Sequence, residues 1–215
     1  LRGNGGDDTL WGGQGDAVLQ GDSGSDTLRL EADFTDASDA QIQGIETVVL
    51  GAAGLTVALT RQSEGMTLQS HAGGGAITGG GGGDLMLGGA GADQLFGGAG
   101  ADTLQGGGGI DSLTGGEGAD TFVFLAATEA PPGATLEQIV DFAPGDRIDL
   151  SGFDADSTLS DRQSFIFLAA EAFPGTAGEP APGLLRWDSL LSVLEGDVNG
   201  DGAADFVLRI RDVQV

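Results

Sequence analysis

Apolar residues recur at every ninth position between Gly79 and Val123, and glycine is the commonest residue between them. The segment divides into five units, GGGGGDLML, GGAGADQLF, GGAGADTLQ, GGGGIDSLT and GGEGADTFV. Their eighth positions are Met86, Leu95, Leu104, Leu113 and Phe122. An apolar residue at one fixed place predicts a short strand that faces a core. The glycines before it predict a tight turn that visits positive φ.

Strands this short and turns this regular predict a coiled chain. Successive strands are expected to alternate between two facing sheets, so that one coil takes two nine-residue units. Residues 18 positions apart then stack on the same edge of the coil. The expected fold class is therefore all-β, a parallel β-roll or β-solenoid.

Each unit also carries one aspartate at its sixth position. The five are Asp84, Asp93, Asp102, Asp111 and Asp120. Asp84, Asp102 and Asp120 are expected to stack on one edge, and Asp93 and Asp111 on the other. Carboxylates stacked at the strand spacing of about 4.8 Å repel each other unless a cation lies between them. Glycine turns leave carbonyl oxygens without partners, and carboxylate plus carbonyl oxygen is the ligand set of Ca²⁺. The sequence therefore predicts several calcium ions in the turns.

The unit resembles the nonapeptide GGxGxDxUx, the calcium-binding repeat of the parallel β-roll in RTX proteins. The resemblance implies one Ca²⁺ between each pair of like-facing turns, held by aspartate carboxylates and by alternate turn carbonyls. The implied carbonyl ligands are those of Gly80, Gly82, Gly89, Gly91, Gly98, Gly100, Gly107, Gly109, Gly116 and Gly118.

The same period starts earlier, with GNGGDDTLW from Gly3, then GGQGDAVLQ and GDSGSDTLR. Asp8 and Asp26 are 18 residues apart and are expected to share an ion. The middle unit departs from the pattern, because Ala17 occupies its sixth position. Between the two blocks, residues 31–78 contain the β-rich runs IETVVL, LTVAL, MTLQ and AIT. We interpret them as metal-free solenoid rungs with longer turns; a separate small β-domain is the alternative.

The glycine period stops after Phe124. The segments that follow, among them EQIVDF, SFIFL, GLLRW and ADFVLRI, predict mostly antiparallel strands, with at most one short helix, that cap the open end of the roll. With DTFVF before them, IVDFAPGDRIDLSGFD and GDVNGDGAADFVLRI resemble the C-terminal domain of serralysin-type secreted metalloproteases. In that family the domain follows the β-roll and carries a type I secretion signal, which the terminal DVQV resembles.

Two further groups of acidic residues are candidate ligands. Asp197, Asn199, Asp201 and Asp205 occupy positions 1, 3, 5 and 9 of an EF-hand-like loop. Leu208 stands where that loop needs a bidentate glutamate, so a hairpin turn built by Asx hydrogen bonds stays an equal alternative. Glu137 and Asp141 are candidates to complete the last site of the roll.

Charge and composition support a cation-binding chain. There are 33 acidic and 8 basic residues, giving a net charge of −25, which repels nucleic acid and anionic membranes. Cysteine is absent, so disulfides and Cys-ligated zinc are excluded. No apolar run is long enough to span a membrane. A single histidine cannot form the H-E-x-x-H motif of a metalloprotease, and no G-x-S-x-G elbow occurs.

These observations favour a non-catalytic, calcium-folded module cut from a longer secreted protein, with the type I secretion machinery as a partner. The alternatives are a surface or matrix module that binds polysaccharide or a cell surface, with Trp11 and Phe34 as its few aromatic candidates, and a non-catalytic part of a secreted exoenzyme. Four segments are expected, namely 1–30 as a first repeat block, 31–78 as metal-free rungs, 79–123 as the main roll and 124–215 as a capping and secretion domain.

Overall fold

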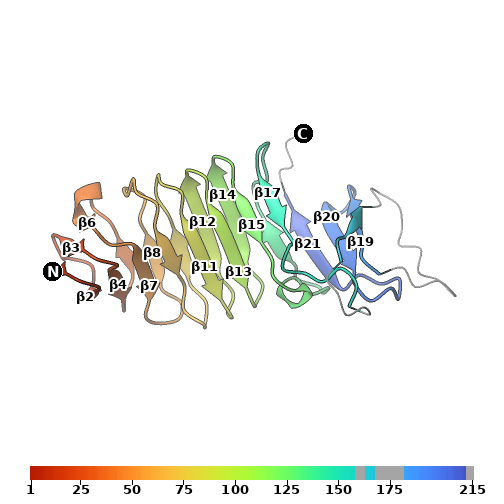
Figure 1. Cartoon of the computed structure of the whole chain (residues 1–215), viewed down its shortest axis with the longest axis horizontal. Helices are drawn as coiled ribbons and strands as arrows, with labels where there is room; N and C mark the ends of the chain where they lie inside the picture. The colour runs from red at the N-terminus through yellow and green to blue at the C-terminus, as the bar shows by residue number, and fades with distance from the viewer. Residues whose placement is uncertain (158–162, 168–181, 212–215) are drawn as a thin grey trace.

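The computed structural model describes residues 1–157, 163–167 and 182–211. The strands lie side by side along the long axis of the molecule, with the N-terminal strands at one end and β19–β21 at the other (Figure 1). DVQV, the expected secretion signal, lies outside the described residues.

Almost all strands belong to two large sheets. The ten-stranded sheet contains β5 (Phe34–Thr35), β8 (Thr56–Ala58), β10 (Ala76–Thr78), β12 (Gln94–Ala99), β14 (Ser112–Glu117), β16 (Glu137–Ile139), β18 (Ile166–Phe167), β19 (Leu184–Asp188), β20 (Val193–Asp197) and β21 (Phe206–Ile210). The eight-stranded sheet contains β2 (Thr9–Gly12), β4 (Thr27–Leu30), β7 (Thr47–Leu50), β9 (Thr67–Gln69), β11 (Leu85–Gly89), β13 (Thr103–Gly107), β15 (Thr121–Val123) and β17 (Arg147–Asp149). A three-stranded sheet holds β1 (Arg2–Gly5), β3 (Leu19–Ser23) and β6 (Ile42–Gln43).

Consecutive strands from β7 to β17 alternate between the two large sheets, and each strand from β7 to β15 pairs in parallel with the strand two places on. Leu104 lies between Met86 and Phe122 in one sheet, and Leu95 pairs with Leu113 in the other. The all-β parallel roll with an 18-residue coil is thereby confirmed. The four β-rich runs between the repeat blocks form β7, β8, β9 and β10 and pair within the same sheets.

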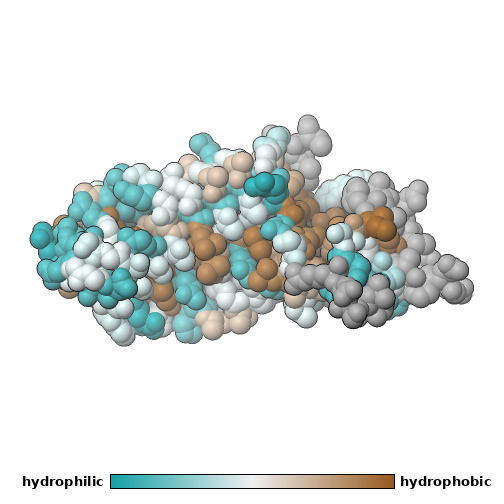
Figure 2. All heavy atoms as spheres, viewed as in Figure 1, coloured by the Kyte–Doolittle hydropathy of each residue, from teal (hydrophilic) through white to brown (hydrophobic). Residues whose placement is uncertain are grey.

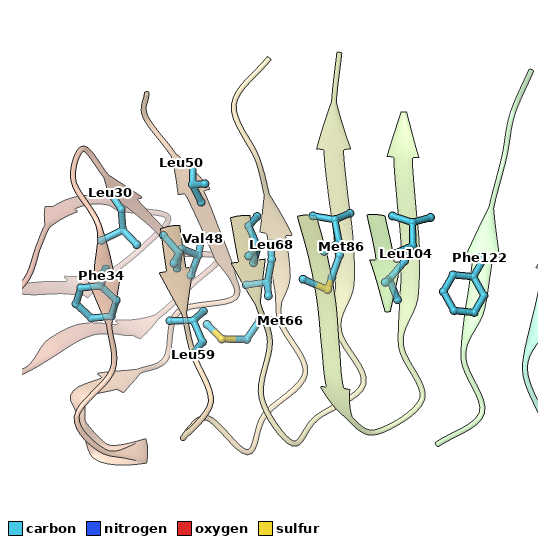
Figure 3. Packing of buried hydrophobic residues seen from close by; sticks show 14 of the residues in the cluster. Leu30, Phe34, Val48, Leu50, Leu59, Met66, Leu68, Met86, Leu104 and Phe122 are labelled. Atoms are coloured by element: carbon cyan, nitrogen blue, oxygen red, sulfur yellow. The ribbon is translucent and has the colours of Figure 1, made fainter. Parts of the chain in front are cut away.

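The core is a narrow column between the sheets, because each strand of the main repeats sends one large side chain inward, while β4 and β7 each send two. Figure 3 shows Val48, Leu68, Met86, Leu104 and Phe122 following one another along this column. Each of these five side chains is at most 2 % exposed. Met86, Leu104 and Phe122 are eighth positions of the repeats, as the nine-residue pattern predicts, and Val48 and Leu68 are their equivalents in the longer rungs.

The C-terminal part first continues the roll and then closes it. β16 and β17 still pair in parallel, with β14 and β15, although antiparallel strands were expected to dominate from here on. The antiparallel strands are β19, β20 and β21, and β21 lies against β16. Phe153, Phe165 and Phe206 pack edge to face beneath them, with ring centroids 4.9–6.0 Å apart.

Within the described ranges, helical structure is limited to two three-residue 3-10 turns, η1 (Asp39–Gln41) and η2 (Ala127–Glu129). No helix in that part of the chain has the length or apolarity to cross a bilayer.

Candidate metal centre

A column of carboxylates runs along the turns that lead into the eight-stranded sheet. The backbone N–H of Asp84 donates to Oδ1 of Asp102, 18 residues later, at 2.7 Å. The N–H of Asp102 donates to Oδ1 of Asp120 at 2.9 Å, and that of Asp8 donates to Oδ1 of Asp26 at 2.8 Å. We call this column the first ladder. Each rung of it fixes the carboxylate of the next coil, so the side chains stack along the axis of the roll.

The opposite edge carries a second ladder. The N–H of Asp93 donates to Oδ1 of Asp111 at 2.8 Å, again across 18 residues. The N–H of Asp111 then donates to Oε2 of Glu137 at 2.8 Å, across 26 residues. The strand register, with Ser112 opposite Gln138, places Glu137 where a sixth-position aspartate would lie. The sequence reasoning paired Glu137 with the turn of Gly115–Asp120, whereas this contact places it beside Asp111, on the opposite edge.

Two members of the first ladder were missed by the sequence reasoning. Glu46 accepts the N–H of Asp26 at 2.7 Å across 20 residues, and Asp146 accepts the N–H of Asp120 at 2.9 Å across 26 residues. Both coils are longer than the 18 residues of two nonapeptides, so a search for a fixed spacing skips them. The signal that would have found them is an acid directly before a β-rich run, as Glu46 stands before Thr47.

Asp141 follows the repeats and, unlike most of the ladder acids, uses both of its carboxylate oxygens to accept backbone N–H groups of the last repeat turn. Its Oδ1 accepts the N–H of Gly115 at 2.9 Å and its Oδ2 accepts that of Gly116 at 2.8 Å. Both carboxylate oxygens therefore already have backbone partners at the turn that carries Asp120.

Most ladder carboxylates keep their second oxygen without a partner. The buried Oδ2 atoms that accept no hydrogen bond are those of Asp8, Asp26, Asp93, Asp102, Asp111 and Asp120, together with Oε1 of Glu137. An unpartnered carboxylate oxygen in a dry site is costly, and such groups occur where an ion or water completes them. The Oδ1 atoms thus hold the ladders together, and the Oδ2 atoms are free to bind something else.

Each free Oδ2 points at a space kept open by glycine. A Cβ atom at Gly97 would collide with Oδ2 of Asp102 and with the carbonyl oxygen of Gly115. A Cβ at Gly88 would likewise meet Oδ2 of Asp93 and the carbonyl oxygen of Gly106. Three groups therefore lie close together. They are the first glycine of a unit, Oδ2 of the aspartate in the same unit, and the carbonyl oxygen of the first glycine 18 residues later. We call this arrangement the glycine cradle.

The carbonyls implied as ligands by the repeat, at the second and fourth positions, stack from coil to coil. The carbonyl oxygen of Gly80 accepts the N–H of Ala99 at 2.9 Å, and that of Gly89 accepts the N–H of Gly108 at 2.7 Å. The carbonyl oxygens of Gly82 and Gly91 face the fourth-position glycines of the next coil. The carbonyls that lie beside the free Oδ2 atoms belong to first positions, which the sequence reasoning did not single out.

The ladder carboxylates are buried, and their pKa values respond to that burial. Desolvation raises the pKa of Asp102 and of Asp111 to about 6, and the neighbouring carboxylates Asp84 and Asp93 add to the shift. Desolvation also raises the pKa of Glu137, to about 8, with Asp111 and Glu129 as the nearest charged contributors. A bound cation would oppose these shifts, because it stabilises the ionised carboxylates.

The first ladder is interrupted between the repeat blocks, and the second ladder starts at Asp93. Met66 stands at the ladder position below Asp84 and donates its N–H to Oδ1 of Asp84 at 2.8 Å. Gly75 stands below Asp93 and donates in the same way, also at 2.8 Å, while the Ser70 hydroxyl donates to the same oxygen at 2.5 Å. The first ladder therefore forms two separate blocks along the molecule, and the second ladder forms one, from Asp93 to Glu137.

The EF-hand-like loop forms the turn between β20 and β21. Oδ1 of Asp197 accepts the N–H of Gly200 and Oδ2 accepts that of Gly202, at 2.6 and 2.9 Å. Asp205 accepts the N–H of Val198 at 2.8 Å and the side-chain amide of Asn199 at 2.8 Å. Asp201 accepts the N–H of Ala203 at 2.8 Å. These are the Asx hydrogen bonds of a hairpin turn, and a metal ion in this loop stays a prediction.

The donor set along the ladders fits a hard divalent cation. Unpartnered carboxylate oxygens and carbonyl oxygens lie together in the cradles, which suits Ca²⁺ and its flexible coordination by oxygen. Among the described residues, no three His, Cys, Asp or Glu side chains form a ready-made metal cluster. That result agrees with sites in which each turn supplies one carboxylate and backbone carbonyls complete the shell.

A parallel roll of glycine turns with one buried aspartate per turn defines a protein of the RTX calcium-binding repeat class. The RTX calcium-binding nonapeptide repeat (4 copies) matches residues 1–33. The Peptidase M10 serralysin C terminal family matches residues 72–214, which is more than half of the chain. The chain therefore belongs to the family of peptidase M10 serralysin C-terminal domains. Both matches are to non-catalytic modules, and proteins of these families are typically exported by type I secretion.

Proposed function

We propose that this chain is a calcium-folded module of a secreted RTX protein, which supports export through a type I system and folding outside the cell. The observation that carries the proposal is the pair of buried ladders whose Oδ2 atoms face glycine cradles. The proposed carboxylate ligands are Asp8 and Asp26 in the first block and Asp84, Asp93, Asp102, Asp111 and Asp120 in the second. The division into segments 1–30, 31–78, 79–123 and 124–215 belongs to the same proposal.

Electrostatics supports a fold that depends on the ion. Isolated buried charges cost several kcal/mol each even after the protein relaxes, and here like charges also stack directly above one another. The core offers little compensation, because each strand between Gly79 and Val123 buries one large apolar side chain, a gain of about 1.5–3 kcal/mol. Ca²⁺ binding is therefore coupled to folding, as in other domains whose sites do not exist in the unfolded chain.

Coupling of this kind suits an exported protein. The chain would stay unfolded where free calcium is scarce and would fold where calcium reaches the level that extracellular modules require, about 10⁻⁴–10⁻³ M. An unfolded chain is the form that a narrow transporter can pass, and its charge of −25 resists premature collapse.

A calcium titration followed by far-UV circular dichroism tests the proposal. We expect a disordered spectrum in chelator and a β spectrum on addition of calcium, with half-saturation at about 10⁻⁴–10⁻³ M. Hydrogen exchange of residues 79–123, measured by mass spectrometry, should show protection only with calcium. A roll that remains protected in excess chelator would contradict the proposal, and Mg²⁺ at the same concentration serves as the control.

The adhesion alternative gains little support from the surface. Of its two aromatic candidates, Trp11 is 64 % exposed and lies under the guanidinium of Arg29, 5.3 Å from its ring centroid. Phe34 is 1 % exposed and belongs to the core, so the expectation of a second exposed aromatic at this place was wrong. Figure 2 shows apolar surface over the middle of the molecule, and the partly exposed apolar residues include Leu85 and Phe96. Nothing about this surface identifies a polysaccharide or a cell-surface partner.

A further inference from the structure

The chain contains two asparagines, and each is followed by glycine, with Asn4 before Gly5 and Asn199 before Gly200. In such a pair the backbone nitrogen of the glycine can attack Cγ of the asparagine side chain, which closes a succinimide ring and releases ammonia. Water then opens the ring at either carbonyl and leaves aspartate or isoaspartate. Glycine favours this reaction because it has no Cβ to hinder the attack. Whether either pair deamidates therefore depends on how the fold holds it.

The side chain of Asn199 is held at both ends of its amide, in the turn between β20 and β21. Its Nδ2 donates to Oδ1 of Asp205 at 2.8 Å, and its Oδ1 accepts the N–H of Asp201 at 2.8 Å. Its backbone N–H is shared between Oδ1 of Asp197 and Oδ2 of Asp205, at 3.2 Å from each. Cγ of Asn199 cannot swing toward the next residue unless both amide hydrogen bonds break.

The nitrogen that would attack is occupied as well. The N–H of Gly200 donates to Oδ1 of Asp197 at 2.6 Å, and both residues are buried. This nitrogen has to leave the carboxylate and lose its proton before it can bond to Cγ of Asn199. Deamidation at this place therefore requires that the turn open first, so that its rate follows how often the turn opens.

Asn4 supplies a matched comparison, because the same residue type follows it in a different setting. Asn4 and Gly5 are both exposed and lie in β1, the edge strand of the three-stranded sheet. Within residues 1–157, 163–167 and 182–211, no group makes a hydrogen bond with the Asn4 side chain. We therefore expect Asn4 to deamidate in the folded chain and Asn199 to be protected there.

Loss of the Asn199 amide would remove a hydrogen bond that closes the turn. Aspartate at this position has an oxygen where Nδ2 now donates to Asp205, and two carboxylates at that separation repel each other. Isoaspartate also lengthens the main chain by one methylene and displaces Gly200 and Gly202, whose N–H groups bind Asp197. β20 and β21 pair through this turn, and β21 lies beside β16 of the roll. Either product therefore opposes closure of the cap.

We propose that Asn199 is a deamidation site that the closed turn between β20 and β21 protects, and that its product prevents this turn from closing again. A chain that stays unfolded therefore loses, with time, the ability to form its cap. The inference goes beyond the proposed function and uses it at one point only, namely that the chain is unfolded where calcium is scarce.

Peptide mapping by mass spectrometry measures the protection. The full chain is incubated at mildly alkaline pH with saturating calcium, with chelator, and with chelator plus urea. The rate at each asparagine is followed by the mass gained when NH₂ becomes OH, and isomerisation at Asp201 does not interfere because it leaves the mass unchanged. With calcium we expect Asn199 to react at least about tenfold more slowly than Asn4, and in both other conditions at an equal rate.

Equal rates at the two asparagines in the calcium-saturated folded chain would overturn the inference, as would protection of Asn199 that persists in urea. Protection that persists in chelator alone and disappears in urea has a different meaning. It supports the assignment of Asn199 and contradicts the proposed function, because the turn then closes without calcium.

A variant that reproduces one product tests the consequence for folding. Asn199→Asp should raise the calcium midpoint for folding or abolish folding, as measured by circular dichroism. Asn4→Asp adds the same charge at the exposed site and should match the unmodified chain. An unchanged or lowered midpoint for Asn199→Asp overturns the inference, since the turn then accommodates the extra carboxylate.

Refolding after a long incubation in chelator tests the loss over time. The unmodified chain should lose refolding yield on return to calcium in step with deamidation at Asn199. Asn199→Gln keeps an amide but reacts slowly, because its ring closure needs a larger ring, so it should keep the yield of its own freshly prepared sample. Equal losses in the two chains, or no loss in the unmodified chain after Asn199 has reacted, contradict the proposal.

Discussion

At the scale of single residues, the two oxygens of each ladder carboxylate have separate roles. Oδ1 of Asp102 accepts a backbone N–H from the coil below, while Oδ2 of the same residue stays buried and unpartnered. The first oxygen sets the position of the side chain before any ion arrives. Pre-positioning of this kind lowers the entropic penalty of binding, because the ligand does not have to search for its geometry.

The glycine cradle leads to a prediction about a residue that carries no side chain. Gly97→Ala places a methyl group where Oδ2 of Asp102 and the carbonyl of Gly115 converge, and forced contacts of this kind cost about 1–3 kcal/mol. We expect weaker calcium binding and a higher calcium midpoint for folding, measured by circular dichroism. Gly81→Ala is the control, since its Cβ would meet only ordinary contacts at 3.6 and 3.9 Å. Equal midpoints for the two variants would argue against the cradle.

At the scale of elements, the sequence predicted the repeats and the strands of the irregular rungs, but it missed the ladder acids Glu46 and Asp146. Five units of equal length place Met86, Leu95, Leu104, Leu113 and Phe122 in the core, because a period of nine needs no knowledge of distant contacts. Glu46 and Asp146 escaped notice because their turns lengthen the coil, and only strand register shows that they occupy ladder positions. The Asp197 loop was ambiguous because the same residues suit a metal loop and an Asx turn.

The C-terminal strands are expected to be required for the roll to fold. They continue its sheets through β16 and β17, and Phe153, Phe206 and Ile210 belong to the same core as Phe122. A chain ending at Val123 exposes the last rungs and loses Glu137 and Asp146 from the ladders. We predict that it stays unfolded at calcium concentrations that fold the full chain. Circular dichroism during a calcium titration of both chains measures this.

Addition of a separate 124–215 peptide to the truncated chain provides the matching control, and partial recovery of the β spectrum is expected. If the truncated chain folds at the same calcium midpoint and with the same steepness as the full chain, the C-terminal region is not a cap.

At the scale of the whole molecule, low pH should partly replace calcium in stabilising the fold. Burial raises the pKa of Asp102 and Asp111 from 3.8 to about 6 and that of Glu137 from 4.5 to about 8. The folded chain therefore binds protons more tightly than the unfolded chain does. These groups stabilise the metal-free folded chain fully when the pH is below their pKa values in the unfolded chain. That stabilisation is lost as the pH rises through their folded-state pKa values, about 6 and then about 8.

We accordingly predict that the chelator-treated chain gains β structure when the pH is lowered from about 8 to about 5, as followed by far-UV circular dichroism. The calcium-saturated chain should show a much smaller change over the same range, because the ions already neutralise the ladders. A metal-free chain that becomes less ordered on acidification to this point would show that the buried acids do not control its stability.

Because strands alternate between two sheets, the effect of adding nonapeptide units depends on whether their number is even or odd. A second copy of residues 88–105 would add one whole coil and lengthen the molecule by one strand spacing, about 4.8 Å, without rotating either end. A single added nonapeptide would fit the stack equally well, but every earlier strand would move to the opposite sheet relative to the cap. The N-terminal block, with Asp8, Asp26 and Glu46, would then lie on the edge that Glu137 closes. Even changes in repeat number act as spacers, and odd changes turn one end of the molecule by half a revolution against the other.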